Sequence, residues 1–89
     1  MTTEYLIIEE VEPPARIKTK RWVVWNKRVH VAHMSLGALG RIEWYGPWRQ
    51  YCYMSTIQAV YSKGCLRDIA DFIEEQMEER KAKAVREDP

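Results

Sequence analysis

The chain has 89 residues, which is enough for one domain, and a domain of this size buries only a modest part of its surface. Hydrophobic residues make up 46% of the chain and charged residues 30%, a composition typical of folded globular proteins rather than disordered ones. Fourteen basic residues against thirteen acidic ones give a net charge of +1, so the chain as a whole is not a polycation suited to DNA or membrane surfaces.

Charged residues are unevenly distributed along the chain. Residues 16–28 carry six cations and no anion, whereas residues 68–79 carry six carboxylates and no cation. We therefore expect a dipolar molecule whose electrostatic preferences are local. The N-terminus lacks a basic segment followed by an apolar one, and no stretch approaches the roughly 18 apolar residues that would span a bilayer. We expect a cytoplasmic protein without membrane contact.

The first half of the chain predicts two strands. Residues 4–11 are rich in β-formers and are followed by two prolines, which cannot donate to a sheet. Residues 20–29 predict a second strand with bulky side chains on both faces, because neighbouring side chains of a strand point to opposite sides. The two faces carry Trp22 and Val24, and Val23 and Trp25. Residues 30–40 contain two glycines among small and polar residues and predict a loop or an irregular continuation.

Residues 41–45 predict a third strand, because apolar and polar side chains alternate there. One face carries Ile42 and Trp44, and the other carries Arg41, Glu43 and Tyr45. The fixed φ of Pro47 suits the second position of a turn over residues 46–49. This turn returns the chain as a fourth strand over residues 50–54. Its two faces carry Tyr51 and Tyr53, and Cys52 and Met54.

A C-terminal helix is predicted over residues 63–80, extending to about residue 84 before a frayed tail. Apolar residues recur there at spacings of three and four, which places them in one stripe. The predicted stripe is Leu66, Ile69, Ala70, Ile73 and Met77, flanked by Cys65 and Phe72. Ser62 is suited to cap the first turn, since its hydroxyl can accept from a free backbone N–H.

These elements predict a single α+β domain over residues 1–89. An antiparallel sheet of three to four strands, over about residues 4–54, carries one amphipathic helix on one face. One helix covers only one face, yet the second strand presents tryptophan on both. Either residues 30–40 fold over the second face, or that face meets a partner, which includes a second copy of the chain in a homodimer.

Catalytic and metal-binding patterns are weak. His30, His33, Cys52 and Cys65 are zinc-ligand types, but they form no Cys-x-x-Cys pair, so we expect two reduced thiols and no metal. The carboxylates of residues 68–79 lie mostly on the outer face of the helix rather than converging in a cleft. The glycines at 37 and 40 do not have the spacing of a phosphate loop. We therefore expect no catalytic residues, no cofactor and no enzymatic activity.

The remaining pattern is arginine interleaved with aromatic residues on the second strand and the hairpin. The candidate binding residues are Trp22, Trp25, Arg28, Tyr45, Trp48, Arg49, Tyr51 and Tyr53. These residue types are enriched in protein–protein hot spots, and they equally stack on bases and pair with phosphates. In a third interpretation the tryptophans fill the core and the arginines extend from its edge. Trp48 and Arg49 are predicted to project from the hairpin tip, with Cys52 inward; alternatively, Trp48 folds back onto the helix.

Two segments, LGRIEWYGPWRQYCY and GCLRDIADFIEEQMEER, make the chain resemble a family of small uncharacterised proteins of phages, prophages and archaeal viruses. The family pattern is a W-Y-G-P-W-R-Q-Y hairpin followed by a C-L-R-D-I-A-D-F-I helix, and the resemblance covers residues 20–80. It implies an accessory protein of a mobile element in the host cytosol, of the size class from which inhibitors of host defence or host enzymes are drawn. It implies no role for any individual residue.

The resulting functional hypothesis is a non-enzymatic binding module that contacts a host or phage protein. The alternative is a protein that binds a nucleotide or single-stranded nucleic acid through an Arg/Trp/Tyr sheet face. A structural or virion-associated part is the third possibility.

Overall fold

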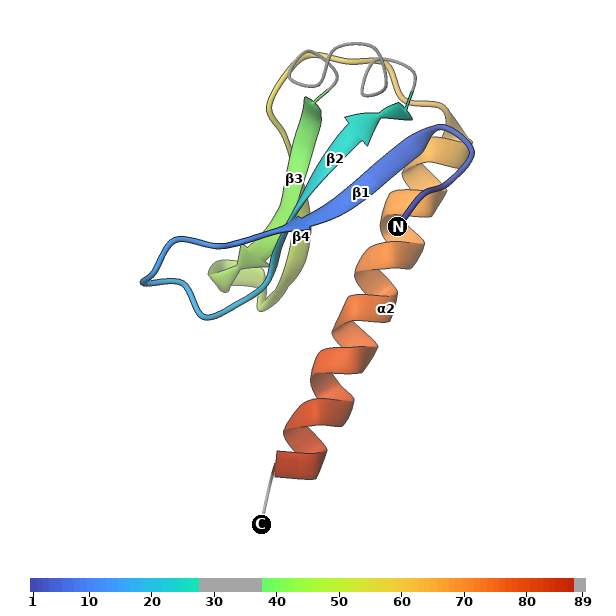
Figure 1. The fold of residues 1–89 in the computed structure, drawn as a ribbon. Coiled ribbons are helices and arrows are strands. Elements are labelled where there is room, and N and C mark those ends of the chain that lie inside the picture. The colour runs from blue at the N-terminus through green and yellow to red at the C-terminus, as the bar shows by residue number, and fades with distance from the viewer. Residues whose placement is uncertain (28–37, 88–89) are drawn as a thin grey trace.

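The computed structural model describes residues 1–27 and 38–87, with side chains as far as Lys83. Four strands are followed by one long helix (Figure 1). The strands are β1 (Leu6–Val11), β2 (Arg21–Asn26), β3 (Ala38–Tyr45) and β4 (Gln50–Ser55), and the helix is α2 (Lys63–Glu87). A short 3-10 turn, η1 (Gly46–Trp48), joins β3 to β4. The predicted α+β architecture is therefore confirmed.

The strands form one sheet in the order β1-β2-β3-β4, and each strand runs antiparallel to its neighbours. The register places Ile8 opposite Val24 and Trp22 opposite Ile42. Because side chains alternate along each strand, this register gathers the apolar residues on the face that α2 covers. The second strand divides as predicted, with Trp22 and Val24 buried and Trp25 on the opposite face.

The third strand is longer than the sequence predicts. It begins at Ala38, so the prediction of a loop or irregular segment is wrong for residues 38–40, while residues 30–37 lie outside the described part of the chain. Gly40 lies within β3, at a point where β4 passes very close to the backbone. A Cβ at Gly40 would collide with the carbonyl of Met54 and the hydroxyl of Tyr53. This glycine allows a close approach and does not break the strand.

Aromatic rings join the sheet to the helix. The ring of Trp22 lies 5.2 Å from the ring of Tyr51 on β4 and 5.2 Å from the ring of Phe72 on α2, both edge-to-face. This geometry is favourable because the positive edge of one ring meets the negative face of another. The other buried residues of the core are Leu6, Ile8, Val24, Ile42 and Ile69.

The buried stripe of α2 differs from the predicted one. Ile69 is buried, and Ile73 and Met77 pack against the core as expected, but Leu66 is 52% exposed. Phe72, predicted only to flank the stripe, is fully part of the core. Relative to the predicted stripe, the helix is rotated about its axis, because the Phe72 ring fills the space beside the rings of β2 and β4. This rotation turns Leu66 and also Ala70 toward solvent.

The N-terminus of α2 follows the prediction. The hydroxyl of Ser62 accepts a hydrogen bond from the backbone N–H of Cys65 at 3.1 Å, as an N-cap does. The preceding connection is tied to the sheet by a hydrogen bond of 2.5 Å between the hydroxyls of Tyr53 and Tyr61. The path from β4 into the helix is thus fixed at two points.

Replacing Phe72 tests the observed helix orientation. Phe72→Ala removes a buried ring and should lower the free energy of unfolding by about 3–5 kcal/mol. Leu66→Ala removes an exposed side chain of the same helix and should change it by less than about 0.5 kcal/mol. Urea denaturation of both variants measures the difference. A larger loss for Leu66→Ala than for Phe72→Ala would contradict the observed packing.

Alkaline pH tests the link between Tyr53 and Tyr61. Burial, assisted by the hydrogen bond that the neutral hydroxyl makes with Tyr61, raises the pKa of Tyr53 above its usual 10.0. The neutral hydroxyl is therefore favoured in the folded state, and its stabilisation is complete below pH 10 and is lost as the pH rises toward the folded-state pKa. Between about pH 9 and about pH 11, Tyr53→Phe should lose less unfolding free energy than the wild type. Equal losses would contradict this assignment.

Candidate binding surfaces

Three of the predicted binding residues support the fold instead of facing solvent. Trp22 is 4% exposed and Tyr51 is 5% exposed, and both rings belong to the aromatic cluster of the core. Tyr53 is half-buried and its hydroxyl is bonded to Tyr61. No broad stacking platform is formed by these rings. Arg28, another predicted binding residue, lies outside the described part of the chain.

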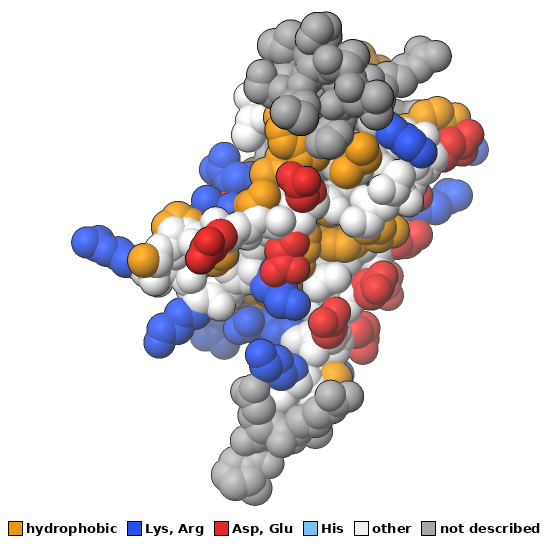
Figure 2. Space-filling view, viewed as in Figure 1, with side chains coloured by type: hydrophobic (Ala, Val, Ile, Leu, Met, Phe, Trp, Pro, Cys, Tyr) orange, Lys and Arg blue, Asp and Glu red, His pale blue; other side chains and the backbone are white. Residues whose placement is uncertain are grey.

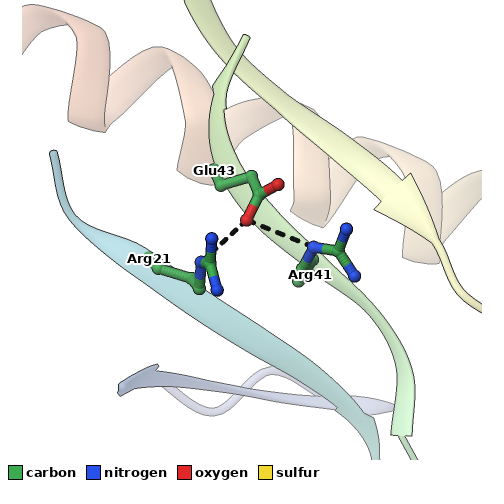
Figure 3. Close-up of polar contacts among 3 residues, drawn as sticks. All are labelled: Arg21, Arg41 and Glu43. Atoms are coloured by element: carbon green, nitrogen blue, oxygen red, sulfur yellow. Dashed lines mark ion pairs between the residues drawn. The ribbon is translucent and has the colours of Figure 1, made fainter. Parts of the chain in front are cut away.

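The sheet face opposite α2 carries Trp25 and a compact ion cluster. The Oε2 atom of Glu43 lies 2.7 Å from the Nε of Arg21 and 3.1 Å from the Nε of Arg41 (Figure 3). Arg21 and Glu43 are direct cross-strand partners of β2 and β3. One carboxylate thus compensates one of the two guanidinium charges, which weakens this face as a binding site for phosphates.

The thiols occupy different surroundings. Cys52 was predicted to point inward, but it lies opposite Glu43, on the face away from α2. It is half-buried there, and desolvation raises the pKa of its thiol, which favours the unreactive protonated form. Cys65 packs against the core from the first turn of α2. Among the described residues, no cluster of His, Cys, Asp and Glu has an arrangement that could hold a metal ion; His30 and His33 lie outside them.

The hairpin tip presents the most exposed of the predicted aromatic residues. The backbone N–H of Arg49 donates to the carbonyl of Gly46 at 3.1 Å, which closes the predicted turn around Pro47. Trp48 is 68% exposed, and its ring stands edge-to-face against the ring of Tyr45 at 5.1 Å. The tip therefore holds an aromatic pair in a defined geometry while leaving one ring open to solvent.

Arg49 has an unusual backbone conformation. Its φ of 52° and ψ of 46° lie in the left-handed region, and it is the one non-glycine residue with positive φ in the described ranges 1–27 and 38–87. Glycine or asparagine adopts this conformation at lower energy than arginine. The side chain is nevertheless exposed at the tip, next to Trp48.

An open groove of about 590 Å³ runs from the tip between β4 and α2. Its apolar wall includes Trp48, Tyr53, Ile73 and Met77, and its rim carries the carboxylates of Glu74 and Glu78. β4 is an edge strand of the described sheet. The N–H of Tyr51 on that strand donates to the Sδ atom of Met77 at 3.4 Å, so α2 satisfies part of the edge.

The sequence does not reveal the acidic rim, because its pattern predicts only that these carboxylates lie on the solvated face of the helix. Glu74 and Glu78 are four residues apart and so lie on the same side of α2, which the sequence does show. Their proximity to the hairpin tip depends on how α2 packs beside β4, and no local pattern records that.

Among the described residues, no helix is both long and apolar enough to cross a membrane.

Comparison with known proteins gives one informative relative. No protein-family profile matches the chain, and no solved structure matches it. Over 80 residues, the chain is 36% identical to a protein of Acholeplasma phage L2 that is described as an uncharacterized 9.3 kDa protein. The alignment covers 90% of this chain and 94% of the phage protein. The chain therefore belongs to the same family of small phage proteins as its Acholeplasma phage L2 relative.

Proposed function

We propose that the protein is a non-enzymatic binding module that docks onto a partner protein through its hairpin tip and the adjoining groove. The observation that carries the proposal is the pairing of an exposed tryptophan with an arginine in the left-handed backbone conformation on a hydrogen-bonded turn. A module of this kind acts by occupying a surface of its partner. Host enzymes and host defence proteins are the partners that a phage protein of this size would be expected to block.

The conformation of Arg49 supports a functional role for the tip. A non-glycine residue in the left-handed region costs about 1–2 kcal/mol, and such outliers concentrate at functional sites. Nothing in the packing of the tip requires a long cationic side chain. The Arg49 side chain is exposed, and the hydrogen bond of the turn is made by the backbone N–H of Arg49, not by its guanidinium. The presence of arginine here is explained if the guanidinium contacts a partner.

Trp48 supplies the apolar part of the proposed contact. Tryptophan and arginine are the residue types most enriched among interface hot spots. The ring is already held by Tyr45 and the 3-10 turn, so little conformational entropy is lost when a partner covers it. The groove beside it continues the apolar surface toward Ile73 and Met77.

The charges around the groove favour a protein partner over a nucleic acid. Glu74 and Glu78 at the rim would repel phosphates and attract lysine or arginine. The alternative of base stacking on a sheet face is not favoured, since Trp22 and Tyr51 are buried. The partner segment that fits this surface therefore combines an apolar side chain with nearby basic residues.

A capture experiment with wild-type and variant proteins tests the proposed contact. The double variant Trp48→Ala/Arg49→Gly removes both side chains and keeps the left-handed turn unstrained. Tagged wild-type protein should retain a specific protein from a host-cell lysate, with or without nuclease treatment. The double variant should capture about tenfold less of that protein, or none. Its melting temperature should fall no further than that of a variant changed at another exposed position.

Tyr5→Ala provides the matched control, because Tyr5 is an aromatic residue that is 53% exposed and directly precedes β1, at the opposite edge of the sheet from β4. It should leave capture unchanged. Capture that survives in the double variant, or that disappears on nuclease treatment, would overturn the proposal.

The strain at Arg49 can be measured separately from binding. Arg49→Gly should raise the free energy of unfolding by about 0.5–1 kcal/mol. Glycine adopts the left-handed conformation without steric strain, and the backbone entropy that glycine loses on folding offsets part of this gain. Chemical denaturation gives this value directly. A destabilised Arg49→Gly protein would show that the arginine side chain is needed for folding and is not reserved for a partner.

A further inference from the structure

A second surface lies where the β1–β2 connection meets the C-terminal half of α2. A pocket of about 250 Å³ is lined there by residues that are far apart in the sequence. They are Lys18, Thr19, Lys20, Tyr51, Gln76, Glu79, Arg80 and Lys83. In Figure 2, Lys and Arg side chains gather at the lower left, over the β1–β2 connection and beside the lower part of α2.

The lining of the pocket carries an excess of cations, although the protein has a net charge of only +1. Four of its lining residues are cations and one is a carboxylate. That carboxylate, Glu79, lies 3.8 Å from the Nζ of Lys20, and the two side chains are 61% and 50% exposed, so the pair is long and solvent-screened. This pair therefore neutralises Lys20 only weakly.

One cation of the pocket is held in place by the fold. The guanidinium carbon of Arg80 lies 4.2 Å from the centre of the Trp44 ring, in a cation–π contact. The Trp44 ring is in turn packed edge-to-face on Tyr51. Stacking on a ring face leaves the in-plane N–H groups of a guanidinium available, and these are the groups that pair with phosphate oxygens.

We propose that this pocket binds the phosphate groups of a nucleotide or of a nucleic-acid strand. Lysine ammonium groups act as point charges for phosphate, and the fixed Arg80 supplies directed donors. Trp44 is covered by Arg80 and Tyr51 is buried, so neither ring of this region is presented to a base. Recognition is therefore by phosphate and independent of base sequence. The site is separate from the hairpin tip and does not depend on the proposed protein contact.

Titration of a fluorescent single-stranded oligonucleotide of about 20 nucleotides tests the pocket. The pocket variant is Lys18→Gln/Lys20→Gln, which leaves the packed Arg80 in place. The matched control is Lys63→Gln/Arg67→Gln, which removes the same charge from exposed positions at the other end of α2. The pocket variant should bind about fivefold or more weakly and show a salt dependence shallower by about 1.4 units, since two phosphate contacts to a single strand are removed.

The control should keep the wild-type affinity within about twofold, and Trp48→Ala/Arg49→Gly should do the same, because the two surfaces are separate. Competition at constant ionic strength identifies the source of the phosphate: tripolyphosphate that displaces the labelled strand at a lower concentration of phosphate groups than the unlabelled oligonucleotide does indicates a free polyphosphate or nucleotide, and the reverse order indicates a strand. Equal weakening in the pocket variant and the control would show general charge attraction and overturn the proposal. Absence of oligonucleotide and tripolyphosphate binding to the wild type would also overturn it.

Discussion

The packing of Trp22 between Tyr51 and Phe72 is the contact on which the rest of the structure depends. A sheet of four short strands cannot bury its apolar face alone, and α2 is the element that covers that face. The edge-to-face contact of Trp22 with Phe72 at 5.2 Å sets the rotation of the helix about its axis, and the contact of Trp22 with Tyr51 at the same distance holds the Trp22 ring within the sheet. Every surface that α2 shares with the sheet follows from that rotation.

Both proposed surfaces are products of this one packing. Tyr51 contributes to the wall of the groove on one side and of the basic pocket on the other, while its ring is anchored in the core. The side of α2 that carries Glu74 and Glu78 borders the groove, and the side that carries Arg80 and Lys83 borders the pocket. A substitution that rotated α2 would therefore disturb both surfaces together, whereas exposed substitutions act on each separately.

The sequence predicts those features that depend on local rules. Alternation assigns the faces of β2 and β3, Pro47 locates the turn, and Ser62 locates the helix start. It does not predict that Phe72 is buried and Leu66 exposed, because helical periodicity allows neighbouring stripes and only the partner surface selects one. The prediction that Cys52 points inward is wrong for a similar reason: alternation separates Cys52 from Tyr51 but does not say which of the two faces α2 covers.

The candidate sites show the same division. Exposure of the tip followed from the turn, since a tip is the part of a sheet that is hardest to cover. The sequence does not predict the left-handed conformation of Arg49, because arginine is a residue type that disfavours this conformation. The proximity of Lys18 and Lys20 to Arg80 joins segments about sixty residues apart, and no local pattern encodes it.

The opposite charges of the two surfaces have a consequence for ligands. A basic protein segment is attracted to the acidic rim of the groove and repelled by the pocket, whereas a phosphate ligand is attracted to the pocket and repelled by the rim. Screening confines each effect to about 10 Å at moderate salt, so each ligand senses mainly the surface it approaches. On the two proposals, an 89-residue chain with a net charge of +1 presents two surfaces of different chemistry, because carboxylates of α2 border the groove while cations of α2 and of the β1–β2 connection border the pocket.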